Sequence, residues 1–181
     1  DKIKKATPSK ALKHPNWSMG KKISIDSSTM MNKVFEFIEA KKIFNLSNKD
    51  ISILIHPTSF IHSIIYLKGD IVKLLGHETS MSIPISNALG IKKKLKNKIF
   101  TNKIKKLNNL SFYLPNIKQF PVLKILDILP EKDSYFETIL ITINDTLVAK
   151  YLDGHISYLS IQKNLLNLIK KSYFKKYYNL K

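Results

Sequence analysis

The sequence contains no cysteine and no arginine, and both absences restrict what the protein can be. Without cysteine it forms neither a disulfide framework nor a zinc-thiolate site, which suits a reducing compartment. All 31 basic residues are lysine, so the guanidinium fork that usually recognises bases and phosphates is missing. We therefore attribute the net charge of +18 mainly to the A/T-rich codons shared by lysine, asparagine and isoleucine, and expect no specific nucleic-acid partner.

Glycine and long apolar segments are also scarce. The five glycines are scattered along the chain, at positions 20, 69, 76, 90 and 154. None of them builds the glycine-rich loop of a nucleotide site, so these 181 residues do not form a dinucleotide-binding domain by themselves. No apolar run approaches the roughly 18 residues of a membrane span, and no signal peptide is visible, so we expect no membrane association.

A short segment near the start differs from the rest of the chain. "HPNWSMGKKISIDSSTMMNK", residues 14–33, holds the only tryptophan and three of the four methionines. Pro15 and Gly20 break regular structure, which is typical of a loop. The segment "DSST" at 26–29 is rich in helix N-cap residues, and the residues after it have helical periodicity, so we expect a helix to begin there. Its predicted apolar side carries Met31, Val34, Phe35, Ile38 and Ile43.

Downstream the pattern predicts strands first and helices later. "ISILIHP" at 51–57 has the composition of a buried strand, and 63–76 is typical of a hairpin that turns at 68–70. Pro84 fits the first turn of a further helix, and helical periodicity returns at 134–152 and 157–171. We expect an α/β protein with three parts: a catalytic α+β domain with a mixed sheet (1–90), a basic linker (91–111) and a small C-terminal helical bundle (112–181).

The predicted helix places four polar residues at functional spacing. A helix N-terminus at Asp26–Ser27 would offer free N–H groups and a positive dipole end to a phosphate. Asn32 and Glu36 are four residues apart and share a face, with Lys33 on its flank. An amide, an ammonium and a carboxylate so placed suit a phosphorylated polyol and one ligand of a divalent metal. The alternative is a capped surface helix with an ordinary Lys–Glu pair.

The loop before this helix carries an imidazole, an indole and a thioether. Large apolar side chains on a loop usually bury against the core or a ligand. Trp17 on such a loop would close over a substrate and exclude water, as a lid does. Packing into the protein core is the alternative.

These motifs resemble one enzyme family. "HPNWSMGKKISIDSSTMMNKVFEFIEA" followed by "LIHPTSFIHS" is similar to the 1-deoxy-D-xylulose 5-phosphate reductoisomerases of non-mevalonate isoprenoid biosynthesis. The resemblance is strong from about residue 7 to 90 and looser but collinear beyond. It corresponds to roughly the second half of a family member. It implies an enzyme that isomerises and reduces 1-deoxy-D-xylulose 5-phosphate to 2-C-methyl-D-erythritol 4-phosphate with NADPH and Mg²⁺ or Mn²⁺.

The resemblance also implies roles for individual residues around the substrate. Glu36 would be a metal ligand, while Ser27, Asn32 and Lys33 would bind the phosphate end and nearby hydroxyls. His14 and Trp17 would belong to the lid, with His14 also touching the substrate. The catalytic set implied in this way is His14, Trp17, Lys33 and Glu36.

Further residues are implied around the cofactor. Met19 and Gly20 would lie close to the nicotinamide, and Met81 in "ETSMSIP" matches a position that packs on NADPH. His62 matches a histidine near the site, with a hydrogen-bonded structural imidazole as its alternative. We expect His56 and His77 to be structural or surface residues.

The resemblance has limits that bear on activity and assembly. Family members supply two more metal carboxylates from an upstream Asp-Ser-Glu motif, which does not occur here, so we expect the chain to be a fragment that is inactive alone. Residues 141–145 replace an "NAANE"-like run with bulkier side chains, so local packing should differ.

The family implies a homodimer, for which the hairpin at 62–76 offers an edge. It also implies a bacterial cytoplasm or, alternatively, a plastid-type organelle.

Two alternatives stay open at this point. One is a degenerate, non-catalytic relative. The other is a lysine-rich module that binds nucleic acid or an anionic surface through residues 91–110, and its affinity would fall steeply with salt.

Overall fold

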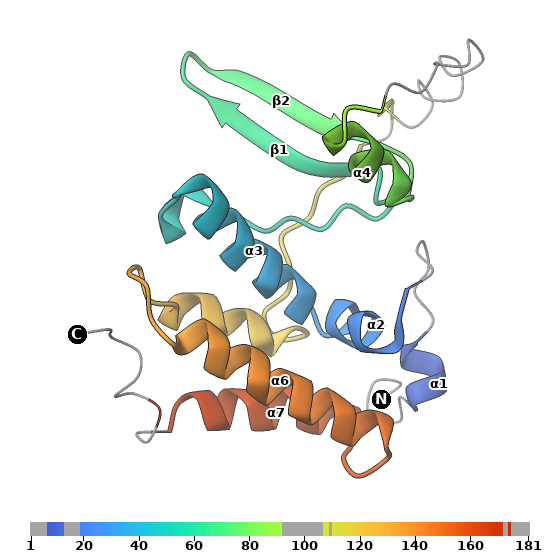
Figure 1. The fold of residues 1–181 in the computed structure, drawn as a ribbon, viewed down its shortest axis with the longest axis vertical. Coiled ribbons are helices and arrows are strands. Elements are labelled where there is room, and N and C mark those ends of the chain that lie inside the picture. Colours follow the sequence, from blue (N-terminus) through green and yellow to red (C-terminus); the bar gives the residue numbers. More distant parts are fainter. Residues whose placement is uncertain (1–6, 13–18, 92–106, 109, 172–173, 175–181) are drawn as a thin grey trace. The chain divides into compact units, whose positions relative to one another are not determined.

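The computed structural model describes residues 7–12, 19–91, 107–108, 110–171 and 174. It divides into two compact units (Figure 1). The described part of the helical unit comprises 7–12, 19–53 and 115–171 with 174, and that of the hairpin unit comprises 54–91, 107–108 and 110–114. These units do not follow the boundaries expected at 90 and 112, because the early helices pack with the C-terminal ones. Most of the predicted linker at 91–111 lies outside the described residues.

The helical unit contains the helices that carry the predicted site residues 27–36. Its elements in order are α1 (Pro8–Ala11), α2 (Lys21–Ser28), α3 (Met31–Phe44), the 3-10 helices η2 (Asn48–Asp50) and η3 (Pro121–Ile128), α6 (Phe136–Leu152) and α7 (Tyr158–Ile169). The two helices predicted near the C-terminus are confirmed as α6 and α7. Among the described residues, no helix combines the length and apolarity needed to cross a bilayer.

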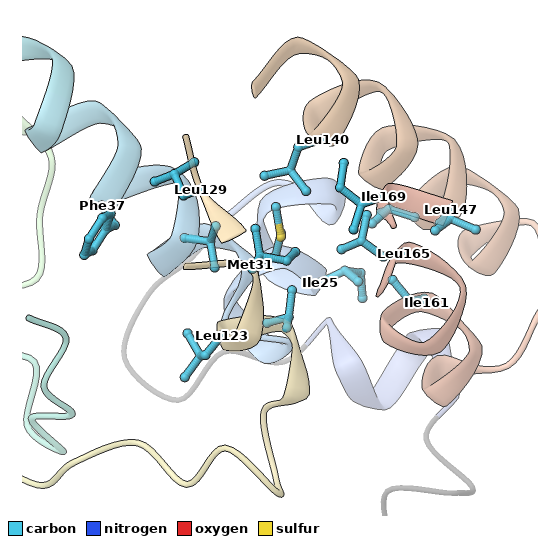
Figure 2. Packing of buried hydrophobic residues seen from close by; sticks show 14 of the residues in the cluster. Ile25, Met31, Phe37, Leu123, Leu129, Leu140, Leu147, Ile161, Leu165 and Ile169 are labelled. Atoms are coloured by element: carbon cyan, nitrogen blue, oxygen red, sulfur yellow. The ribbon is translucent and has the colours of Figure 1, made fainter. Parts of the chain in front are cut away.

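The core of the helical unit joins α2 and α3 to the C-terminal helices. Figure 2 shows Ile25 and Met31 packed among apolar side chains of η3, α6 and α7. Met31 is fully buried, so one of the unusual methionines has a packing role. The predicted apolar side of α3 is right at Met31 and Val34 but wrong at Ile43, which is exposed, whereas Phe37 is buried.

The C-terminal end of α3 is held by polar contacts to the segment before α6. Lys41 is buried, and its Nζ donates to the carbonyl of Pro130 at 2.7 Å and pairs with Glu131 at 3.1 Å. Lys42 forms an ion pair with Asp133. These contacts reach across about 90 residues of chain and fix the end of the helix whose first turns carry the candidate site.

The hairpin unit is built on two antiparallel strands, β1 (Ile61–Leu67) and β2 (Ile71–Gly76). The predicted turn at 68–70 is confirmed, and Gly69 supplies its φ of 77° there at no steric cost. α4 (Ser82–Ala88) follows with Pro84 in its first turn, as predicted. The strand expected at 51–57 is wrong: within the described residues this segment makes one isolated bridge, Ile55 to Tyr113. The α+β class is confirmed, and the described part of the expected mixed sheet is this antiparallel pair.

Candidate functional site

The candidate site lies around the short connection between α2 and α3. The expected helix start at Asp26–Ser27 is wrong, because both residues lie in the last turn of α2. α3 begins at Met31, after Met30 in a left-handed conformation with φ 66°. The free N–H groups of a helix start are therefore not at Ser27, which offers a ligand its side-chain hydroxyl instead.

The reason for this error is that the side chains of "DSST" act at a helix end instead of a helix start. The hydroxyls of Ser28 and Thr29 both donate to the carbonyl of Ile25, at 2.8 and 3.1 Å. The Thr29 hydroxyl also accepts the N–H of Met31 at 3.4 Å. The same residue types satisfy carbonyl groups or N–H groups, so composition alone does not distinguish the two ends.

The predicted cluster on α3 is confirmed in its geometry. Nδ2 of Asn32 donates to Oε1 of Glu36 at 2.6 Å, and Nζ of Lys33 pairs with Oε2 of the same carboxylate at 2.6 Å. The side chains of Lys33 and Glu36 are 41% and 45% exposed, so the cluster is open to a ligand from solvent. An exposed pair of this kind contributes only about 0.2–1 kcal/mol to stability, so folding alone gives little reason for the arrangement.

Ser27 differs from the residues on either side of it. Asp26 and Ser28 are both hydrogen-bonded to distant helices, through Asn144 and Tyr158 respectively. Among the described residues, no side-chain hydrogen bond involves the half-buried Ser27 hydroxyl. That hydroxyl is therefore available to a ligand.

The metal prediction depends on the donor atoms that the chain offers around Glu36. Glu36 is a hard oxygen donor on an exposed helix face and suits Mg²⁺ or Mn²⁺. Within the part of the chain that the structure describes, no three His, Asp or Glu residues come together as a metal site. Glu36 thus fits one position of a metal shell whose other ligands have to come from elsewhere, as the missing Asp-Ser-Glu motif suggests.

The residues expected around the nicotinamide lie in different units. Met19 is half-buried ahead of α2, and Gly20 is the residue that precedes this helix. A Cβ at Gly20 would meet no atom within 4 Å, so the space beside this backbone is open. Met81 lies just before α4 in the hairpin unit and is 59% exposed. His14 and Trp17, the predicted lid residues, lie outside the described residues.

The three other histidines singled out have contacts within the hairpin unit. His62 stacks on His77 with ring centroids 3.7 Å apart, and its Nε2 lies 3.1 Å from the carbonyl oxygen of His77. This is the hydrogen-bonded environment of the structural alternative, and a site role for His62 stays a prediction. Nδ1 of His56 lies 2.9 Å from the Ser111 carbonyl oxygen.

A polar cluster between α2 and α6 was not foreseen from the sequence. Oδ1 of the buried Asp26 accepts from Nδ2 of Asn144 at 2.8 Å, and Oδ2 pairs with Nζ of Lys22 at 2.8 Å. Lys22 also pairs with Asp145 at 3.0 Å. Burial lowers the pKa of Lys22, but the hydrogen bonds and charges of the two aspartates outweigh it and raise that pKa. The only sequence signal was the unusual composition of 141–145, which contains Asn144 and Asp145.

Alkaline pH is expected to weaken the contact between α7 and α2. Burial raises the pKa of the Tyr158 phenol, and its hydrogen bond with Ser28 opposes this only in part. The folded state thus holds this proton more tightly than the unfolded chain does. The contribution of this phenol to the free energy of unfolding is complete below the ordinary tyrosine pKa of about 10. It falls as pH rises above that value.

This effect is measurable as a difference between two proteins. We expect the melting temperature of the 181-residue chain, relative to that of Tyr158→Phe, to decrease between about pH 9.5 and 11. The comparison cancels the change in net charge that both proteins undergo. A constant difference across this range would show that Tyr158 does not titrate differently in the folded state.

The fold and the site together define a helical domain that presents a carboxylate, an amide and an ammonium side by side on the open face of α3. A family model described as the 1-deoxy-D-xylulose 5-phosphate reductoisomerase C-terminal domain matches residues 1–44. A second one, the DXP reductoisomerase C-terminal domain, matches residues 76–181 and so runs through the basic segment. The chain belongs to the 1-deoxy-D-xylulose 5-phosphate reductoisomerase family.

Curated relatives agree with this assignment. The chain is 50% identical over 173 residues to the 1-deoxy-D-xylulose 5-phosphate reductoisomerase of Pelagibacter ubique, which covers 94% of this chain and 44% of the relative. It is 40% identical over 169 residues to the enzyme of the same name from Buchnera aphidicola, covering 93% of this chain and 42% of the relative. The chain therefore spans less than half the length of these relatives.

Solved structures share the fold. A DOX-P reductoisomerase in complex with NADPH, fosmidomycin and magnesium matches with a TM-score of 0.83 and 30% identity, over 97% of this chain and 43% of that one. The Zymomonas mobilis 1-deoxy-D-xylulose 5-phosphate reductoisomerase in complex with NADPH matches with a TM-score of 0.78 and 30% identity. This match covers 93% of this chain and 43% of that one.

Proposed function

We propose that this chain supplies the carboxyl-terminal half of an active site that converts 1-deoxy-D-xylulose 5-phosphate to 2-C-methyl-D-erythritol 4-phosphate. The observation that carries this proposal is the Glu36 carboxylate, held between Asn32 and Lys33 on the open face of α3. Glu36 would bind Mg²⁺ or Mn²⁺, which when bound supplies a Lewis acid for the substrate oxygens. NADPH would be the reductant.

The chain's own side chains would bind and orient the phosphorylated substrate. Lys33 carries a charge that suits a phosphate, and it lies one residue from the Asn32 amide, which donates to hydroxyl or phosphate oxygens. The Ser27 hydroxyl would add one more donor. His14 and Trp17 would cover the substrate as a lid and exclude water, and Met19, Gly20 and Met81 would contact NADPH.

The chain has part of the machinery and depends on residues that it does not contain. Neither a glycine-rich nucleotide loop nor an Asp-Ser-Glu motif occurs in the 181 residues. The proposal is tested with a chimera, in which the amino-terminal part of the Pelagibacter ubique relative precedes residues 1–181. We expect this chimera to oxidise NADPH when 1-deoxy-D-xylulose 5-phosphate and Mg²⁺ are present, and to form the branched polyol phosphate. A folded chimera without turnover would favour a degenerate relative instead.

Assembly as a homodimer is part of the same proposal. The hairpin exposes a series of apolar side chains on both strands: Ile65, Tyr66, Leu67, Ile71, Val72, Leu74 and Leu75. Exposed apolar surface of this kind is typical of an interface. We expect the chimera to sediment as a dimer, and a monomer at micromolar concentration would contradict this. We also propose a cytoplasmic location, which cell fractionation would check.

A further inference from the structure

Two helices from the far end of the chain hold the residues on either side of Ser27. Asn144 of α6 donates to Asp26 at 2.8 Å, across 118 residues of sequence. The hydroxyl of Tyr158 of α7 donates to Oγ of Ser28 at 3.0 Å, across 130 residues. Asp26 is 1% exposed and Asn144 is fully buried, so the first contact lies inside the protein, and the second, from Tyr158 at 7% exposed, is partly buried.

Helix geometry determines what these two contacts do to Ser27. Successive residues of an α-helix are about 100° apart around its axis, so Asp26 and Ser28 lie on either side of Ser27. Because α6 bonds Asp26 and α7 bonds Ser28, the half-buried Ser27 lies between two positions that are held by other helices. The two hydrogen bonds therefore fix the rotation of the last turn of α2 and the direction in which the Ser27 hydroxyl is presented.

Stability alone is a poor explanation for the first contact. The Oδ1 atom of Asn144 is buried and has no hydrogen-bond partner among the described residues. A buried polar atom without a partner is destabilising, and replacing both Asn144 and Asp26 by apolar side chains of similar shape would avoid that cost. An asparagine at this position is better explained by the specific direction of its single donor bond to Asp26.

The same cluster also reaches α3. Nζ of Lys22, which pairs with Asp26 and Asp145, lies 5.1 Å from the centroid of the Phe35 ring. Phe35 is adjacent to Glu36 in sequence. Asp26 thus contacts α6 directly and, through its partner Lys22, is linked to α3.

We propose that Asn144 and Tyr158 are positioning residues for the Ser27 hydroxyl, acting through Asp26 and Ser28. The inference rests on the proposed function, in which Ser27 binds the phosphate of the substrate. It assigns to α6 and α7 a role in substrate binding that requires no contact between those helices and the substrate.

The test is a set of KM measurements on the chimera at saturating NADPH and Mg²⁺. We expect Asn144→Ala and Tyr158→Phe to raise the KM for 1-deoxy-D-xylulose 5-phosphate by about three- to tenfold, the value of one hydrogen bond. The kcat should stay within about twofold and the KM for NADPH should not change, because the mispositioned group acts on substrate binding alone. Thr142→Ala is the matched control, since among the described residues this exposed hydroxyl of α6 bonds only the carbonyl of Thr138.

Two further comparisons separate positioning from a merely structural role. In an S27A background, Asn144→Ala should raise the KM no further, because the group that it positions is already gone. The reciprocal exchange of Asp26→Asn with Asn144→Asp restores an amide–carboxylate pair and should return the KM toward that of the unaltered chimera. A structural role would instead lower the melting temperature and leave the KM unchanged.

Failure of this inference is distinguishable from failure of the proposed function. If Ser27→Ala leaves the KM unchanged, the phosphate-binding role of Ser27 is wrong. If Ser27→Ala raises the KM while Asn144→Ala and Tyr158→Phe do not, Ser27 binds substrate and the positioning role is wrong. Tyr158→Phe removes one oxygen only, so it gives an answer even if Asn144→Ala does not fold.

Discussion

Replacing Glu36 by glutamine is expected to lower metal-dependent NADPH oxidation by the chimera by about a hundredfold or more. Glutamine keeps the shape of the side chain and one oxygen that accepts from Asn32, but it loses the negative charge that a divalent cation requires. Loss of several kcal/mol of charge stabilisation corresponds to this change in rate. The rate is measured over a titration of Mg²⁺ and Mn²⁺.

The matched control for this variant is Glu39→Gln. Glu39 is an exposed carboxylate on the same helix, three residues further on, so its replacement changes the net charge equally. We expect this control to keep its activity, and both variants to melt within about 2 °C of the parent. Binding of Mn²⁺, followed by its paramagnetic resonance, should weaken in Glu36→Gln only. Unchanged activity or unchanged Mn²⁺ affinity would remove Glu36 from the metal site.

Truncating Leu140 to alanine is expected to cost about 2–5 kcal/mol of unfolding free energy in the 181-residue chain. Leu140 is a fully buried residue of α6 and lies in the cluster that contains Ile25 and Met31 (Figure 2). Its removal leaves a cavity in the core that joins the site helices to the C-terminal helices. Urea unfolding followed by circular dichroism measures the change.

The neighbouring residue provides the control. Ile141 is 44% exposed on the same helix, so Ile141→Ala should change the free energy of unfolding by no more than about 0.5 kcal/mol. Equal effects of the two substitutions would mean that α6 does not pack through Leu140 in solution. That result would contradict the description of one core shared by α2, α3 and α6.

Local patterns predicted those parts of the fold that depend on neighbours in sequence. The hairpin follows from Gly69 and Asp70 between two apolar runs, and α6 and α7 follow from their helical periodicity. The Asn32–Glu36 contact follows equally from a spacing of four on a helix. In each case the interacting residues are close in the chain, so the sequence contains the whole interaction.

Errors arose where distant residues decide the outcome. Asp26 looked like an N-cap, but a contact with Asn144, 118 residues away, makes it a buried residue of α2. The apolar segment 51–57 looked like a strand, but Ile51 and Ile53 pack against the helical core instead of pairing in a ladder. Local spacing does not reveal which distant residues Asp26, Ile51 and Ile53 will contact. The hydrogen bonds that Asn144 and Tyr158 make on either side of Ser27 were missed for the same reason.

The central claim is that this chain carries one half of a reductoisomerase active site. The most direct measurement compares NADPH oxidation by the isolated chain and by the chimera under identical conditions, with 1-deoxy-D-xylulose 5-phosphate and Mg²⁺. We predict turnover by the chimera and none by the isolated chain, because these 181 residues contain neither a glycine-rich nucleotide loop nor an Asp-Ser-Glu motif. Turnover by the isolated chain, or none by a folded chimera, would contradict the claim.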